Sequence, residues 1–195
     1  MQPTLQEMDR EGLATLWREQ MPQDFPRGEI KPLPLLLSLY DRGKTRIFAL
    51  TERGQLLAYA ILEIPDEGDV WLLDYLAVTR ENRGTGLGSL LLSLLPERLP
   101  GACAVLAEIE RIDRAPDEAA QAVRTRRKRF YLANGLTETG VYTRADGGID
   151  YEILCLSCRA GVTGADAARA MERIYATFFS PGDYAVYDGT KATTL

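Results

Sequence analysis

The sequence has no histidine among its 195 residues. A Ser-His-Asp triad, a Cys-His pair and a His-ligated zinc site are therefore excluded. Any general base must instead be an aspartate, glutamate, tyrosine, cysteine or lysine side chain, or a water molecule relayed by one of them. This absence limits the chemistry of any active site before the fold is known.

Cysteine is scarce, with three residues in the chain. Cys155 and Cys158 have the spacing of a metal-binding pair, but no second pair completes a four-cysteine site. Both lie in the strand-like run EILCLSC, where positions i and i+3 face opposite sides. We predict that they are small buried residues, and that the protein holds no metal.

Long apolar runs are also missing. The most apolar segments, Leu35–Leu37 and Leu90–Leu95, fall far short of the ~20 residues that a membrane helix needs. The polar N-terminus has no secretory apolar region, so we expect a cytoplasmic protein without a membrane partner. The formal charge of −5 argues against nucleic acid as a partner, and the basic run 124–129 has no interleaved aromatic residues.

The apolar pattern predicts alternating helices and strands. Helices are expected over residues 4–19, 34–40, 88–99, 117–134 and 165–179, with Thr4 as the N-cap of the first. Strands are expected over residues 46–50, 55–64, 70–78, 102–110, 137–144 and 149–157. This order predicts one three-layer α/β domain over residues 1–158, with helices in 1–45. Residues 159–195 would form a C-terminal helix and tail.

Three closely spaced glycines separate the strand at 70–78 from the following helix, in the sequence Arg83-Gly-Thr-Gly-Leu-Gly88. Glycine permits positive φ and lets a phosphate approach the backbone. The N–H groups from Gly84 to Ser89 and the positive end of the helix dipole would then bind that phosphate. The segment is not a P-loop, because no Gly-Lys-Ser/Thr follows, and Ser89 breaks the dinucleotide-binding pattern.

Arg83, Gly86 and Gly88 resemble motif A of the GNAT superfamily of N-acetyltransferases, and residues 126–136, RRKRFYLANGL, resemble its motif B. The resemblance covers about residues 46–158. It implies a three-layer α-β-α fold with a mixed, mostly antiparallel sheet, in which the strands at about 70–78 and 102–110 splay apart. It also implies acetyl-CoA as the co-substrate. The pantetheine arm would pair with the backbone of Leu76, Ala77 and Val78. The pyrophosphate would bind Arg83 and the N–H groups of Gly84, Thr85, Gly86, Leu87, Gly88 and Ser89.

The same resemblance implies that Tyr131 is the general acid that protonates the departing CoA thiolate. A base is harder to choose. Glu108 and Glu110 stand at i and i+2 on the strand after the loop helix, so alternation places them on one face. Asp74 shares a face with apolar residues, and a buried carboxylate must be paired or used. We rank Glu108 first, then Glu110 and Asp74.

These residues predict an N-acetyltransferase in which a primary amine attacks acetyl-CoA directly in a ternary complex. One alternative is a module that binds or senses acyl-CoA without catalysis. Another is a small oxidoreductase, with Glu108 as a ribose ligand. The acceptor would be a small molecule or a peptide, and the resemblance implies that residues 22–40 and 145–150 select it. The final helix carries an apolar stripe that would pack on its own domain or on a second subunit, so a homodimer is also open.

Overall fold

The computed structural model describes residues 2–145 and 148–188, and their contacts divide the chain into two units. The first unit is built from residues up to 64 together with residues 73–98. The second is built from residues 65–72 together with residues from 99 onward. One strand, β4 (Val70–Val78), contributes its beginning to the second unit and the remainder to the first.

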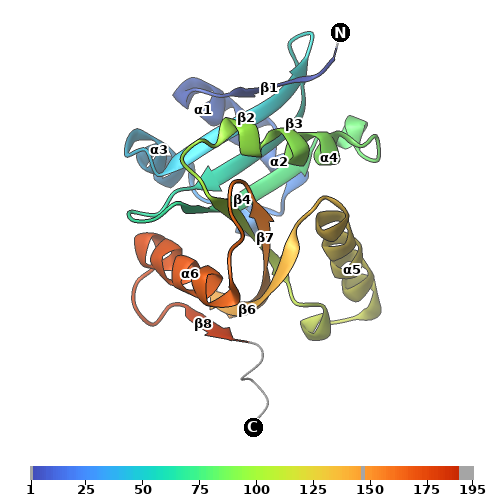
Figure 1. The fold of residues 1–195 in the computed structure, drawn as a ribbon. Coiled ribbons are helices and arrows are strands. Elements are labelled where there is room, and N and C mark those ends of the chain that lie inside the picture. The colour runs from blue at the N-terminus through green and yellow to red at the C-terminus, as the bar shows by residue number, and fades with distance from the viewer. Residues whose placement is uncertain (1, 146–147, 189–195) are drawn as a thin grey trace. The chain divides into compact units, whose positions relative to one another are not determined.

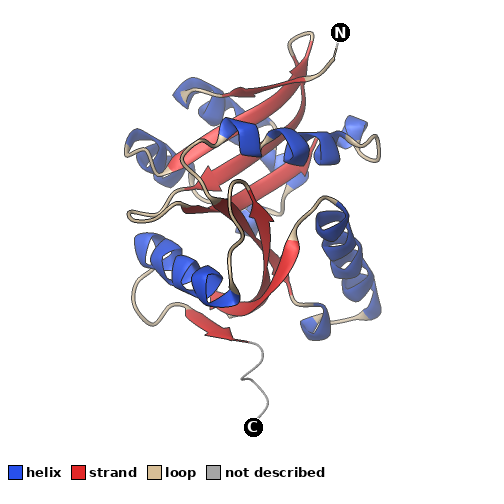
Figure 2. Ribbon diagram, viewed as in Figure 1, coloured by secondary structure: helices blue, strands red, loops and turns tan. Residues whose placement is uncertain are grey.

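The strands of the first unit lie in the order β1-β2-β3-β4 (Figure 2). The pairs β1–β2 and β2–β3 are antiparallel, and β2 and β3 form a hairpin through the turn at residues 53–54. Their bounds are β1 Thr4–Glu7, β2 Thr45–Glu52 and β3 Gln55–Glu63. The helices are α1 Arg10–Glu19, α2 Met21–Asp24, α3 Leu33–Asp41 and α4 Leu87–Leu94, with short 3-10 segments η1 Arg27–Glu29, η2 Arg80–Asn82 and η3 Pro96–Arg98.

Helices cover both faces of these strands (Figure 1). Apolar residues of α1, α2 and α3 form a core with β2, β3 and β4 on one face, whereas α4 crosses the other. The buried members of this core are Leu13, Leu16, Met21, Leu36, Ile47, Tyr59, Ile61, Tyr75 and Ala77. The unit is therefore a three-layer arrangement whose middle layer ends, at the end of β4, in the Gly-rich loop.

The second unit has the strand order β5-β7-β6-β8, and its neighbouring strands are all antiparallel. Its strands are β5 Ala104–Glu110, β6 Thr137–Ala145, β7 Ile149–Ser157 and β8 Ala185–Asp188, and its helices are η4 Ile112–Arg114, α5 Glu118–Ala133 and α6 Gly164–Phe178. Figure 1 shows α5 and α6 on opposite sides of β6 and β7. The side chain of Asp117 caps α5, and Thr163 and Asp166 form a capping box on α6.

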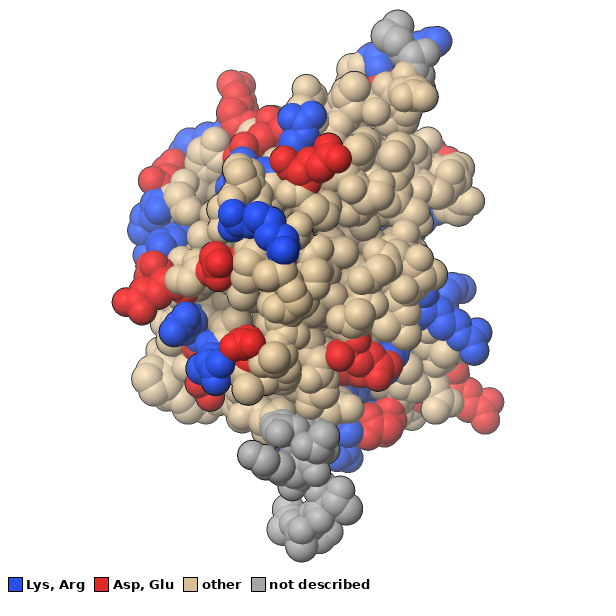
Figure 3. Space-filling model, in the orientation of Figure 1, with Lys and Arg blue, Asp and Glu red and all other residues tan. Residues whose placement is uncertain are grey.

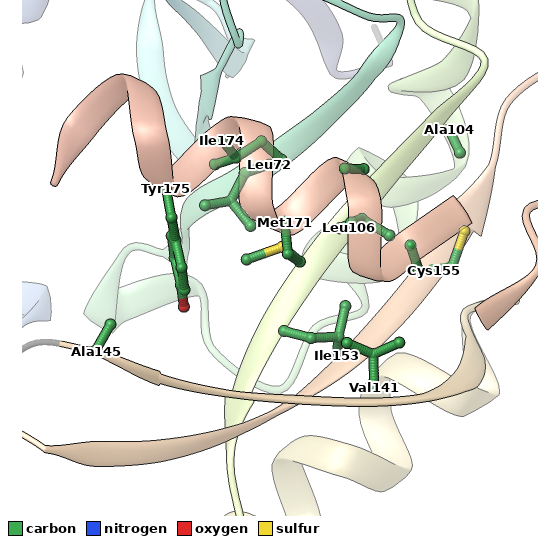
Figure 4. Close-up of a cluster of buried hydrophobic side chains, with 12 residues drawn as sticks. Leu72, Ala104, Leu106, Val141, Ala145, Ile153, Cys155, Met171, Ile174 and Tyr175 are labelled. Carbon is green, nitrogen blue, oxygen red and sulfur yellow. The ribbon is translucent and has the colours of Figure 1, made fainter. Parts of the chain in front are cut away.

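The apolar stripe of α6 packs on its own unit. Met171, Ile174 and Tyr175 meet Leu106 of β5 and Ile153 of β7 in a buried cluster (Figure 4). Each of these side chains is almost fully buried, and burying a large apolar side chain contributes about 1.5–3 kcal/mol. The stripe therefore belongs to the core of the second unit and anchors a helix that lies beyond the motif-bearing segment.

The predicted α/β fold class is confirmed, and so are most of the predicted elements. The helix predicted over residues 4–19 is wrong at its start. Thr4–Glu7 is a strand paired with β2, and Asp9 caps α1 instead of Thr4. The pairing partner is distant in sequence, so local periodicity could not reveal it.

Two other elements differ from the prediction. The helix predicted over residues 88–99 ends at Leu94, because Pro96 interrupts it and starts η3. Strand β8 lies in a segment predicted to be a tail. Part of the segment expected to select the acceptor, residues 145–150, lies outside the described residues. No helix in the described ranges is long and apolar enough to cross a membrane.

Candidate acetyl-CoA-binding and catalytic residues

The Gly-rich loop connects β4 to α4 through η2, and glycine is required at two of its positions. Gly84 has φ of +78° and Gly86, the N-cap of α4, has φ of +85°. Residues with a Cβ rarely adopt such values. A Cβ built at either glycine would meet no atom within 4 Å, so the space above the loop is open. The sequence expectation of a tight, ligand-accessible turn agrees with this geometry.

The amides of this loop are available for a ligand. The first amide to enter the helical pattern is that of Leu90, which donates to the carbonyl of Gly86. Among the described residues, none accepts a hydrogen bond from the N–H groups from Gly84 to Ser89. Helix α4 has no side-chain cap, so its positive dipole end is also uncompensated. The arrangement matches the needs of a pyrophosphate group.

Arg83 is oriented differently from the expectation. Its Nε donates to the carbonyl of Val78 at 3.2 Å, and its Nη2 donates to Oδ1 of Asp24 at 2.8 Å. About half of the Arg83 side chain is exposed, whereas the Asp24 side chain is 0% exposed. The guanidinium therefore fixes the loop to the end of β4 and to α2.

Asp24 is held by further donors. Its Oδ2 accepts from the Tyr59 hydroxyl at 3.1 Å and from Nε2 of Gln20 at 2.9 Å. Burial and the neighbouring Asp24 charge raise the pKa of Tyr59, so the phenol stays a donor at all ordinary pH values. Removing one partner of a buried ion pair lowers the free energy of unfolding by about 3–5 kcal/mol. Because Arg83 is half-exposed, we expect the loss for the Arg83–Asp24 pair to lie at or below the lower end of that range.

The backbone of Leu76, Ala77 and Val78 lies at the end of β4, next to the loop. Ala77 is buried in the core of the first unit, and Leu76 and Val78 are half-buried. The Val78 carbonyl already accepts from Arg83. A pantetheine arm along this strand would therefore use the other backbone groups of these residues.

Tyr131 lies near the C-terminal end of α5, half-buried beside the edge of the Phe130 ring. Burial raises the pKa of Tyr131 to about 12, and the charge of Arg127 partly opposes this. In the part of the chain that the structure describes, its hydroxyl has no hydrogen-bond partner. The phenol is therefore protonated at neutral pH and has its donor available.

Glu108 belongs to a polar network under α6. Its Oε1 accepts from the Tyr175 hydroxyl in a short hydrogen bond and from the Thr143 hydroxyl at 3.1 Å. The two hydroxyl oxygens lie 2.9 Å apart. Burial and the Glu108 charge raise the pKa of Tyr175, so this phenol also remains a donor. The network fixes the orientation of the carboxylate.

Glu110 contacts a different helix, although alternation predicts one face for both glutamates. Its carboxylate pairs with Arg124 at 2.6 Å and with Arg127 at 3.2 Å, both on α5. Glu110 is the last residue of β5 and lies where the chain turns toward η4. Both of its carboxylate oxygens are therefore engaged in ion pairs with α5.

Asp74 forms an ion-pair cluster in the first unit. The Lys31 ammonium lies 2.8 Å from Asp74 and 2.6 Å from Glu63. Burial alone would lower the pKa of Lys31, but the charges of Asp74 and Glu63 outweigh it and hold that pKa well above its usual value. Asp74 is therefore engaged as the partner of a permanent cation, as expected for a paired buried carboxylate.

The basic run of α5 is largely neutralised by acidic partners. Besides the Glu110 pairs, Lys128 contacts Glu138 and Glu152, each at 2.7 Å. Figure 3 shows acidic and basic side chains interspersed on the face that it draws. The run is thus mainly a set of ion pairs that fix α5 to its own unit.

The cysteines are free thiols. Burial raises the pKa of Cys155 to about 11 and also raises that of Cys103 and Cys158. A raised pKa disfavours the thiolate that a nucleophile or a metal ligand needs. Within the described ranges, no group of acidic or cysteine side chains is arranged to hold a metal ion.

Sequence reasoning did not single out Asp24, Lys31, Thr143 or Tyr175. Each acts through a partner far along the chain: 43 residues separate Lys31 from Asp74, and 67 separate Tyr175 from Glu108. One weak signal existed for Tyr175, because a tyrosine within a helical apolar stripe brings a hydroxyl that needs a partner when buried.

Comparison with known proteins identifies the chain's relatives. Residues 11–127, more than half of the chain, match the acetyltransferase (GNAT) family. The match begins well before residue 46, so part of the N-terminal helical segment belongs to the shared domain. None of the curated proteins matches the sequence.

Several solved structures share the fold. A GNAT-family protein from Bacteroides thetaiotaomicron is 19% identical with a TM-score of 0.68, over 90% of this chain and 97% of its own. The ribosomal-protein-S18-alanine N-acetyltransferase from Escherichia coli is 22% identical with a TM-score of 0.56, and the match covers 82% of this chain and 96% of its own. The protein yncA from Salmonella typhimurium, solved with its cofactor acetyl-CoA, is 16% identical with a TM-score of 0.55, and the match covers 84% of this chain and 98% of its own.

Proposed function

The chain belongs to the GNAT family of acetyltransferases, and we propose that it transfers the acetyl group of acetyl-CoA to a primary amine by direct attack. The observation that carries this proposal is the Gly-rich loop, whose amides from Gly84 to Ser89 have no acceptor among the described residues. They follow directly on β4 and open α4, where an anion is stabilised by backbone donors and the helix dipole.

In this proposal the amides of the loop bind the pyrophosphate of acetyl-CoA. The pantetheine arm pairs with the backbone of Leu76, Ala77 and Val78, except for the Val78 carbonyl that Arg83 occupies. These backbone donors are already in position before the ligand binds. Binding therefore loses little free energy in ordering side chains. Arg83 supports the loop rather than serving as the main phosphate ligand.

The reaction needs two proton transfers. The neutral amine attacks the acetyl carbonyl carbon, the C–S bond breaks, and the amine loses a proton while the CoA thiolate gains one. Tyr131 supplies the proton to sulfur. With a pKa near 12, the free-protein phenol is a weaker acid than a thiol of about 8.5. Full transfer to sulfur is then uphill by roughly 5 kcal/mol, so Tyr131 donates a hydrogen bond to the developing thiolate and gives up its proton only as the C–S bond breaks. The phenolate that this leaves recovers a proton from solvent.

Glu108 remains our first choice for the proton acceptor. Glu110 and Asp74 are already engaged in ion pairs with guanidinium and ammonium groups, which leaves their oxygens less accessible to an incoming amine. Glu108 accepts hydrogen bonds from hydroxyl groups that also fix its orientation. A base in a fixed orientation requires less reorganisation when the amine arrives.

Direct attack is favoured over a covalent acyl-enzyme. Histidine is missing from the sequence, and burial raises the pKa of each cysteine. An acyl-cysteine intermediate would need an activated thiolate, which these surroundings disfavour. A ternary complex requires only binding, orientation and the two proton transfers.

The test is a calorimetric titration with acetyl-CoA, followed by mass spectrometry of candidate amines incubated with protein and acetyl-CoA. The amines should include a peptide with a free N-terminus, a polyamine and an aminoglycoside. We expect micromolar binding and a mass gain of one acetyl group on at least one amine. Binding without any acetylated product would favour the sensing module, and preference for NAD over acetyl-CoA would overturn the proposal.

A further inference from the structure

Arg83 connects elements that are far apart in the sequence. Its guanidinium bonds the Val78 carbonyl, at the end of β4, and Asp24, the last residue of α2. Asp24 in turn accepts from Tyr59 of β3 and from Gln20. We propose that Arg83 and Asp24 form a clamp that positions the Gly-rich loop for acetyl-CoA, so that Asp24 is a positioning residue and Arg83 is not a phosphate ligand.

Electrostatics explain why Arg83 stays with Asp24. The Asp24 carboxylate is completely removed from solvent, and Arg83 is the cation that its contacts provide. If a phosphate drew the guanidinium away, a buried negative charge would be left with only neutral donors, Tyr59 and Gln20. The new ion pair between the phosphate and Arg83 would be half-exposed to water, and such ion pairs are weak. The clamp is therefore the more stable arrangement.

The clamp has a consequence for the acceptor side. Helix α2 lies in the N-terminal segment that we expect to select the amine, and Asp24 joins it to the cofactor loop. If binding of the amine shifts this contact and changes the affinity for acetyl-CoA, then acetyl-CoA changes the affinity for the amine by the same factor. This inference rests on the proposed function, since it concerns the placement of the acetyl-CoA loop.

The experiment is a double-mutant cycle on acetyl-CoA affinity at one salt concentration. Arg83→Met and Asp24→Asn are each expected to weaken acetyl-CoA binding about tenfold. The double variant is expected to lose no more affinity than the more strongly affected single variant. If Arg83 were a phosphate ligand, Asp24→Asn would leave the affinity unchanged or raise it, because the guanidinium would be released. Additive losses would also overturn the clamp.

A second variant keeps the test decisive if Asp24→Asn does not fold. Arg83→Lys retains the charge but cannot bond Val78 and Asp24 with one planar group. The clamp predicts a loss of at least about fivefold, whereas a phosphate ligand would be largely replaced by lysine. Arg80→Met, which removes the same charge from an exposed position of η2, is the matched control and should stay within about twofold.

Failure of the clamp and failure of the proposed function have different signatures. If the unmodified protein does not bind acetyl-CoA, the proposed function is wrong. If the unmodified protein binds acetyl-CoA and Arg83→Lys binds it with the same affinity, the proposed function stands and the clamp is wrong. An equal loss in Arg80→Met and Arg83→Met would mean that overall charge, rather than the contact with Asp24, sets the affinity.

Discussion

The Gly-rich loop and the candidate bases use different parts of the polypeptide. In the loop, the groups available to a ligand are backbone amides, and the side chains mainly close the turn, as when the Thr85 hydroxyl donates to the Asn82 carbonyl at 2.6 Å. Among the candidate bases, the functional group is a side chain whose properties depend on distant partners such as Tyr175 or Lys31. The proposed cofactor contacts therefore depend on local backbone conformation, whereas the proposed proton transfers depend on tertiary contacts.

Tyr131→Phe should produce the largest effect, because it removes the proton donor and leaves the loop intact. We expect kcat to fall about a hundredfold while the affinity for acetyl-CoA changes by less than about twofold. Steady-state kinetics and calorimetry measure the two quantities. Tyr142→Phe, on a ring that stacks with Tyr187, is the control. An unchanged kcat in Tyr131→Phe would remove Tyr131 from the mechanism.

Glu108→Gln should lower kcat/KM about thirtyfold and abolish the acid limb of the pH profile. The matched control is Glu110→Gln, which makes the same change on the same strand. It leaves Arg124 and Arg127 without their carboxylate, so it should reduce the melting temperature more than the rate. The ranking would be reversed if Glu110→Gln had the larger effect on the pH profile.

Gly86→Ala should weaken acetyl-CoA binding about tenfold, because alanine at positive φ costs about 1–2 kcal/mol and shifts the amides of the loop. Gly54→Ala imposes a similar strain in the β2–β3 turn, where φ is +78°. It should lower stability without changing affinity. Acetyl-pantetheine, which lacks the pyrophosphate, should bind both variants equally. A loss of acetyl-pantetheine binding in Gly86→Ala would mean that the loop contacts another part of the ligand.

Tyr175→Phe should have a moderate effect, about threefold on kcat/KM. The variant removes a hydrogen bond to the charged form of Glu108, so the acid limb should move toward higher pH. Phenylalanine keeps the packing against Phe179 and Tyr184. A pH profile that coincides with that of the unmodified protein would mean that the network is structural only.

The smallest effect concerns alkaline pH. Burial raises the pKa of Tyr131 to about 12, so the phenol remains the proton-carrying form throughout the range below that value. The kcat/KM for acetyl-CoA reports on the free enzyme, and Tyr131 should cause no decline up to about pH 10. A decline below pH 10 that disappears in Tyr131→Phe would contradict the raised pKa.

The fold and the conformation of the Gly-rich loop were largely predictable from the sequence, because they depend on periodicity and on glycine. The strand at β4, the turn at Gly84 and Gly86 and the helix that follows are all local features. Strand β1 was missed because a short edge strand is defined by its partner β2. The orientation of Arg83 toward Asp24 was missed for the same reason, since the residues are 59 positions apart.

Nuclear magnetic resonance of the backbone amides during an acetyl-CoA titration tests the central claim most directly. If the loop binds the pyrophosphate, the amide signals of Gly84, Gly86 and Gly88 should shift in a saturable way, because phosphate oxygens would accept from them. The signals of Gly54, in the β2–β3 turn, and of Gly140, in strand β6, should not shift. Binding that leaves the loop signals unchanged would contradict the assignment of the cofactor site.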